Sequence, residues 1–201
     1  MSTDPCFLRP RGQKISILTM MSSISTKTGD CGQTSLANGQ RVAKDSLVME
    51  VIGTLDELSS WMGLVIAHAK SDFLPHKNTL GQVQQDLYQL SAVIVKAPGV
   101  KFRKLALGRL EKQAEMIQAL LGDRWHSKFL QPGGTKLAAQ LDITRTVCRR
   151  CERLAFKYSQ QTRVPVLILQ YLNRLSDYLY LLRCYINLDQ KYCEKQFILD
   201  K

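Results

Sequence analysis

The chain has 201 residues, of which 45% are hydrophobic and 22% are charged, so its composition is that of an ordinary globular protein. This composition excludes wholesale disorder and fibrous repeats, and the length suffices for one buried core. Its apolar stretches, such as residues 91–95 and 164–169, are far too short to span a bilayer, which excludes a membrane-spanning protein.

The formal net charge of +11 predicts a surface that attracts polyanions. Nucleic acid, acidic lipid and nucleoside triphosphates all fit, and charge alone does not choose among them. A basic helical module that binds nucleic acid is one hypothesis, but the sequence holds no recognised nucleic-acid motif and few aromatic residues for base stacking. The six cysteines are spread through a chain large enough to fold without a disulfide framework, which fits a reducing compartment.

Residues 1–23 are poor in acidic side chains and carry Arg9, Arg11 and Lys14. Two interpretations are open. The segment is either a transit peptide, which would direct the chain to the mitochondrial matrix, or a disordered extension created by an upstream start codon. We favour the extension, and with it a cytoplasmic location, because Pro5 and Pro10 interrupt any amphipathic basic helix.

From about Leu47, apolar residues recur at spacings of three and four, which predicts amphipathic helices. Because no stretch alternates as a half-buried strand does, the expected fold class is all-α, a five-helix up-and-down bundle over residues 24–190 with a C-terminal tail at 191–201. The last helix is apolar over a wide arc, which indicates either a central position or a subunit interface. The apolar repeats of the first three helices cover residues 51–65, 80–94 and 107–121. The fourth helix is expected from about residue 135 to 161, and the fifth from about 164 to 188.

A polar, glycine-rich segment precedes the first helix at residues 26–36 and is followed by Arg41 and Lys44. Glycines let successive backbone N–H groups converge on an anion, while hydroxyls and lysine add donors and charge. The segment is therefore either a phosphate-binding loop or a flexible polar loop without a ligand, and it lacks the order of a Walker A motif.

The fourth helix carries Arg145, Arg149 and Glu152 at spacings that place them on one face. Apolar residues flank this stripe, so we expect it to point into a polar cleft. The same helix contains Cys148 and Cys151, which formally match a Cys-x-x-Cys motif. Both fall in the apolar seam, and we interpret them as small core residues and not as metal or redox ligands.

The fifth helix carries Asn173 and Asp177 four residues apart, which makes a polar line on a mostly apolar helix. Buried polar groups need partners. These partners are either neighbouring arginines or a bound ligand, and the sequence favours neither interpretation.

Five segments in this order resemble the ATP:cob(I)alamin adenosyltransferases of the PduO type. The family signatures TKTGDxGxTSL, GTxDEL, FxLPGG, RTxxRRxER and YLNRLSDYL correspond to residues 26–36, 53–58, 129–134, 145–153 and 171–179. The resemblance covers most of the chain, from about Ile24 to Leu188. Cys31 departs from the pattern, because the family usually has lysine there, and the loss of that charge would weaken ATP binding.

The resemblance implies a homotrimer of ferritin-like bundles that binds ATP with Mg²⁺ between subunits and takes cobalamin as its second substrate. An electron-donating reductase and an adenosylcobalamin-dependent enzyme would be its partners. Phe129 would displace the lower axial ligand of cobalt, Asp56 and Arg145 would form an intersubunit ion pair, and no side chain is assigned as a direct metal ligand. The ATP site implied by the resemblance consists of Thr26, Lys27, Thr28, Gly29, Arg41, Lys44, Arg149, Glu152 and Asn173, with Arg149 and Asn173 also counted as catalytic. A cobalamin carrier or ATP sensor that performs no turnover is the remaining alternative.

Overall fold

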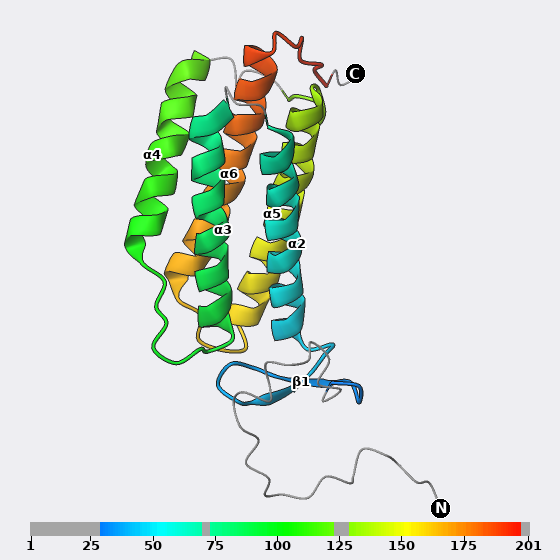
Figure 1. Ribbon diagram of the computed structural model, residues 1–201, viewed down its shortest axis with the longest axis vertical. Helices are drawn as coiled ribbons and strands as arrows, with labels where there is room; N and C mark the ends of the chain where they lie inside the picture. Colours follow the sequence, from blue (N-terminus) through cyan, green and yellow to red (C-terminus); the bar gives the residue numbers. More distant parts are fainter. Residues whose placement is uncertain (1–28, 70–72, 123–128, 198–201) are drawn as a thin grey trace, which may run out of the picture.

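The computed structural model describes residues 29–69, 73–122 and 129–197, and the expectations for residues 1–23 lie outside these ranges. The predicted bundle is confirmed, because five long helices make up most of the described chain (Figure 1). They are α2 (Leu47–His68), α3 (Leu74–Ile94), α4 (Lys104–Leu121), α5 (Lys136–Ser159) and α6 (Val166–Asp189).

The helices alternate in direction along the bundle, as short connections between consecutive helices require (Figure 1). Helix α5 packs against both α2 and α6, α6 also packs against α4, and α2 packs against α3. Helix α6 is buried along most of its length within the single chain. Its wide apolar arc therefore reflects a central position in the bundle.

A small hairpin precedes the bundle and was not predicted. Strands β1 (Gln33–Ser35) and β2 (Arg41–Ala43) pair antiparallel, with Thr34 opposite Val42. Each strand has only three residues and only its central residue is partly buried, so neither shows a periodicity that sequence reading could detect. The hairpin lies at the end of the bundle where α2 begins (Figure 1).

Helix α5 begins where the sequence indicated, and its first turn is capped. The Thr135 hydroxyl accepts a hydrogen bond from the backbone N–H of Ala138, which satisfies one of the donors left free at a helix start. Helix α3 begins earlier than its apolar repeat suggested, at Leu74, because a proline occupies its first turn, where no N–H is needed.

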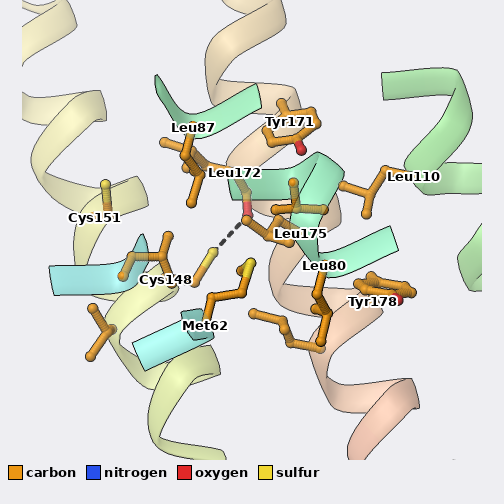
Figure 2. Close-up of a cluster of buried hydrophobic side chains, with 14 of the residues drawn as sticks. Met62, Leu80, Leu87, Leu110, Cys148, Cys151, Tyr171, Leu172, Leu175 and Tyr178 are labelled. Atoms are coloured by element: carbon orange, nitrogen blue, oxygen red, sulfur yellow. Dashed lines mark hydrogen bonds between the residues drawn. The ribbon is translucent and has the colours of Figure 1, made fainter. Parts of the chain in front are cut away.

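The core is formed by side chains from all five helices, among them Met62, Leu87 and Leu110 (Figure 2). Cys148 and Cys151 are free thiols that are fully buried, and the Cys148 thiol donates to the carbonyl of Leu172, at 3.3 Å. The interpretation of both cysteines as core residues is thus confirmed.

One cysteine differs from the expectation. Cys31 is disulfide-bonded, whereas Cys148, Cys151, Cys184 and Cys193 are free. The spread of cysteines along the sequence carried no signal for this bond, because the connectivity of a disulfide follows from the fold and not from spacing.

Candidate functional site

A cleft of about 510 Å³ opens on the face of the bundle where α4, α5 and α6 meet. It is lined mostly by charged and polar side chains, which makes it a better candidate for a charged ligand than for an apolar one. The lining residues are Glu111, Ala114, Glu115, Gln118, Arg145, Arg149, Arg174, Ser176, Asp177, Tyr180 and Leu181.

The two cleft arginines of α5 differ in how far they are already engaged. Arg145 lies over the ring of Tyr180, with its guanidinium carbon 5.9 Å from the ring centroid, and its Nε is 3.9 Å from a carboxylate oxygen of Asp142. Arg149 is exposed and makes no ion pair with any residue in the described ranges. Burial raises the pKa of Tyr180 to about 12, so the phenol beside Arg145 stays neutral.

The neighbouring Arg150 faces a different direction. Its guanidinium donates to the carboxylate of Glu57 on α2, on the side of α5 away from the cleft. The stripe predicted to point into a polar cleft is confirmed for Arg145 and Arg149, whereas Glu152 does not line this cleft. Arg150 instead joins α5 to α2.

Glu152 and Asn173 come together across the α5–α6 contact. The Asn173 side-chain amide donates to Glu152 at 2.8 Å, and its oxygen accepts a hydrogen bond from Arg174 at 2.5 Å. Arg174 in turn pairs with Asp177 at 3.0 Å. The hydrogen bonding of Asn173 to an arginine, one of the two open interpretations, is thus observed, and it holds the amide and the carboxylate in a fixed relation to one another.

The predicted phosphate loop is described only in part, because Thr26, Lys27 and Thr28 lie outside the described residues. A side chain placed on Gly29 would come within 3.1 Å of the ammonium group of Lys44, so glycine leaves room for this lysine. The Arg41 guanidinium donates to the hydroxyl of Ser35 at 3.3 Å, across the hairpin. Gly29 and Lys44 therefore lie close together.

Phe129 is not a core residue, since 85% of its surface is exposed. It directly precedes Leu130, which forms an isolated antiparallel bridge with Gln196 near the C-terminus. This loop lies at the end of the bundle where α5 begins, opposite the end that carries the hairpin (Figure 1). One chain therefore does not bring Phe129 and the hairpin residues Arg41 and Lys44 into a single site.

Asp56 and Arg145 do not meet within the chain either. Asp56 is exposed on α2 and lines a second cleft, of about 820 Å³, between α2 and α3, whereas Arg145 lines the first. The two residues lie on different faces of the bundle, so the ion pair predicted for them is not formed within one chain and stays a prediction about two chains.

The described residues offer neither a metal-binding cluster nor a membrane-spanning helix. Within residues 29–69, 73–122 and 129–197, no group of three or more His, Cys, Asp and Glu side chains could hold a metal ion. Across the same ranges, no helix has the length and apolar character needed to cross a membrane.

Comparison with known proteins identifies the family. The family model described as cobalamin adenosyltransferase matches residues 24–186. A cobalamin adenosyltransferase from Cupriavidus metallidurans is 37% identical over 170 residues, covering 83% of this chain and 89% of the relative. The corrinoid adenosyltransferase of Bacillus subtilis is 36% identical over 160 residues (77% and 81%), and the Homo sapiens corrinoid adenosyltransferase MMAB is 31% identical over 198 residues (94% and 78%).

Solved structures agree with this assignment. A variant PduO-type ATP:corrinoid adenosyltransferase from Lactobacillus reuteri, complexed with cobalamin and ATP, superposes with a TM-score of 0.82 at 28% identity, covering 87% of this chain and 99% of that one. An arginine-to-lysine variant of the Lactobacillus reuteri protein, complexed with ATP, gives a TM-score of 0.81 at 28% identity, with 87% and 100% covered. The sequence motifs, the five-helix bundle and these relatives agree: the chain belongs to the cobalamin adenosyltransferase family.

Proposed function

We propose that this protein transfers the 5′-deoxyadenosyl group of ATP to cob(I)alamin, forming adenosylcobalamin and releasing triphosphate. The observation that carries the proposal is the cleft between α4, α5 and α6, where Arg149 has no acidic partner among the described residues. An arginine left without a partner in a cleft is available to an anionic ligand, and family membership supplies ATP as that ligand.

The reaction requires positive charge near the leaving triphosphate and does not require a nucleophilic side chain. A bond forms between cobalt and the 5′ carbon of ATP, the bond from that carbon to the phosphate oxygen breaks, and its electron pair leaves with triphosphate. The growing negative charge needs fixed cations. Arg149 offers a planar fork of donors that matches two phosphate oxygens, and Mg²⁺ would arrive bound to ATP.

Glu152 and Asn173 would act beside Arg149. Their mutual hydrogen bond at 2.8 Å fixes both groups before any ligand binds, so ordering them costs little entropy at the moment of binding. We propose that Arg41, Lys44, Gly29 and the segment preceding it complete the triphosphate site.

We further propose that the active unit is a homotrimer. The hairpin and the Phe129 loop lie at opposite ends of one bundle, and Asp56 and Arg145 lie in different clefts, so a second copy is needed to complete the site. Contact between the α2–α3 face of one copy and the arginine-bearing face of the next would pair Asp56 with Arg145. Light scattering of the wild type tests the stoichiometry. An Asp56→Arg variant should dissociate, and the double exchange with Arg145→Asp should restore assembly.

Phe129 is proposed to contact cobalamin and displace the lower axial ligand of cobalt. An aromatic side chain left 85% exposed gains free energy from any apolar ligand that covers it. A Phe129→Ala variant should therefore lose turnover with cob(II)alamin under reducing conditions more than it loses affinity for ATP.

The decisive experiment is an anaerobic assay of the purified protein with Mg-ATP and chemically reduced cobalamin. Formation of a light-sensitive cobalt–carbon product together with one equivalent of triphosphate supports the proposal. Binding of cobalamin without either product would instead identify a carrier, and salt-sensitive binding of RNA or DNA without turnover would identify a nucleic-acid module.

Two cellular expectations accompany the activity. A reductase would supply the electron that generates cob(I)alamin, and an adenosylcobalamin-dependent enzyme would receive the product. We propose the cytoplasm as the compartment, with the mitochondrial matrix as the alternative that applies if residues 1–23 act as a transit peptide. Fractionation of cells that express the full chain distinguishes the two.

A further inference from the structure

Arg183 is an arginine buried within the apolar α6, with only 1% of its surface exposed. Its Nε donates to Asp142 at 3.1 Å, and one terminal nitrogen donates to Glu194 at 2.7 Å. The other terminal nitrogen donates to the backbone carbonyl oxygens of Gln131 and Gly133, at 2.7 and 3.3 Å. One guanidinium thus joins α5, the loop that follows Phe129, and the chain beyond α6.

Two more side chains complete this network around the same loop. Asp142 accepts a hydrogen bond from the backbone N–H of Gly133 at 2.7 Å. Asn187 accepts from the N–H of Thr135 at 3.0 Å, and its amide donates to the Gly133 carbonyl and to Glu194 at 3.1 and 3.0 Å. Every bond to the loop is made to its backbone, so the network fixes the path of the loop.

The C-terminal segment, residues 192–197, is held against the same loop. The Gln131 N–H donates to the Lys195 carbonyl, and the Phe197 N–H donates to the Phe129 carbonyl, both at 2.8 Å. Glu194 is therefore the side chain through which Arg183 and Asn187 hold the segment that pairs with Phe129.

The adjacent Leu130 packs against the core, but Phe129 does not. The Phe129 side chain is 85% exposed. Gly133 and Gly134 follow it with φ of 123° and 108°, a backbone region that glycine alone enters readily, so the loop has no intrinsic stiffness there. The position of Phe129 relative to the bundle therefore depends on the packing of Leu130 and on the backbone hydrogen bonds made through the network.

We propose that Arg183 and Glu194 are positioning residues, which clamp residues 192–197 onto the 129–134 loop and so hold Phe129 ready to meet cobalamin. The inference rests on the proposed function, because it assigns the clamp to the cobalamin half of the reaction. It predicts that weakening the clamp impairs the handling of cobalamin while ATP binding in the arginine cleft is unaffected.

Glu194→Ala is the test variant, because Glu194 lies beyond α6 and the buried Arg183 keeps its ion pair with Asp142 when Glu194 is removed. Removing Arg183 instead would leave the buried Asp142 without its nearest cationic partner and endanger folding. Glu194→Gln keeps an acceptor oxygen without the charge and should give an intermediate effect. Asp189→Asn is the matched control: Asp189 is exposed at the end of α6 and takes part in none of these hydrogen bonds.

The first readout needs no ligand. In the free protein, hydrogen exchange at the amides of Gln131 and Phe197 should accelerate about tenfold in Glu194→Ala, because a hydrogen bond to a charged group is worth at least about that factor. Exchange at these amides should stay at the wild-type rate in Asp189→Asn.

The second readout follows cobalamin itself. With Mg-ATP present, Glu194→Ala should raise the KM for cobalamin about tenfold and lower, by a similar factor, the fraction of bound cob(II)alamin that is four-coordinate by electron paramagnetic resonance. The KM for ATP should stay within about twofold of wild type.

The outcomes separate the two levels of the proposal. If Glu194→Ala exchanges faster but handles cobalamin as the wild type does, the network only stabilises the loop and the positioning role is overturned. Unchanged exchange overturns it as well, because the clamp then does not hold the loop. If the wild type itself forms no adenosylcobalamin, the proposed function fails, and the positioning role fails with it whatever the exchange rates show.

Discussion

Adjacent arginines on α5 allow a sharp test of the cleft. Arg149 lines the cleft and has no acidic partner in the described chain, whereas Arg150 pairs with Glu57 on α2. Arg149→Gln and Arg150→Gln each remove one positive charge from the same turn of the same helix. The overall field of the protein therefore changes almost equally in the two variants, and only the local contact differs.

The size of the effect follows from the bond that is lost. A charge-assisted hydrogen bond to a phosphate is worth about 1.5–3 kcal/mol, and the exposure of Arg149 argues for the lower half of this range. We expect Arg149→Gln to lower kcat/KM for ATP about 10- to 40-fold. Arg150→Gln should change it less than about threefold, because a half-exposed ion pair contributes little to the site.

The assay is steady-state formation of adenosylcobalamin at saturating cob(I)alamin and varied ATP, with circular dichroism confirming that each variant is folded. Arg149→Lys separates charge from geometry: it keeps the positive charge but loses the planar fork, so it should fall between the wild type and Arg149→Gln. Equal losses in Arg149→Gln and Arg150→Gln would show that net charge, and not the cleft contact, drives ATP binding.

Three further predictions concern the frame around the site. Tyr171→Phe removes a buried hydrogen bond to Asp86, at 2.9 Å, and should lower the melting temperature by about 2–8 °C in calorimetry; an unchanged value would mean that Asp86 does not need this partner. Burial lowers the pKa of His76 below 6.5, so the unfolded chain takes up the proton first and stability falls as pH drops through that value. His76→Gln should flatten this loss in urea titrations between about pH 7 and pH 5.5, and an identical slope in both proteins would assign it to other groups. Burial raises the pKa of Cys151 to about 12, so mass spectrometry after brief iodoacetamide treatment of the native protein should find the exposed Cys193 alkylated and Cys151 not; early alkylation of Cys151 would show that the core opens readily.

The sequence predicts the helices well because each carries a long apolar repeat. Leu55, Leu58 and Met62 are fully buried, as their spacing on one face required. The same reasoning correctly placed Arg145 and Arg149 on one face of α5, because the helical repeat fixes which side chains share a face.

The sequence could not predict which segments far apart along the chain contact one another. No periodicity reports that residues 192–197, which we treated as a tail, return to pair with the Phe129 loop, since this contact joins segments far apart along the chain. Arg183 did leave a signal that was not used. Arg183 lies between Leu182 and Cys184 in an apolar helix. Because a charged residue is rarely buried without partners of opposite charge, this position predicts acidic side chains nearby.

The site residues also differ in how far the sequence could predict their arrangement. Cys31, Lys44 and Gly29 were recognised as one loop because they are close in sequence, and the structure keeps Gly29 against Lys44. Asp56 and Arg145 could be paired only by resemblance, because nothing in one chain brings their two clefts together.

The return of the C-terminal segment onto the bundle has a practical consequence for handling the protein. Phe197 donates its N–H to the Phe129 carbonyl, so residues 192–197 belong to the end of the bundle that carries the Phe129 loop. An affinity tag or fluorescent fusion at the C-terminus would pull on the segment that pairs with this loop, whereas the hairpin lies at the opposite end of the bundle (Figure 1). Purification handles are better placed at the N-terminus, and any C-terminally tagged preparation with weak activity should be remade before its kinetics are interpreted.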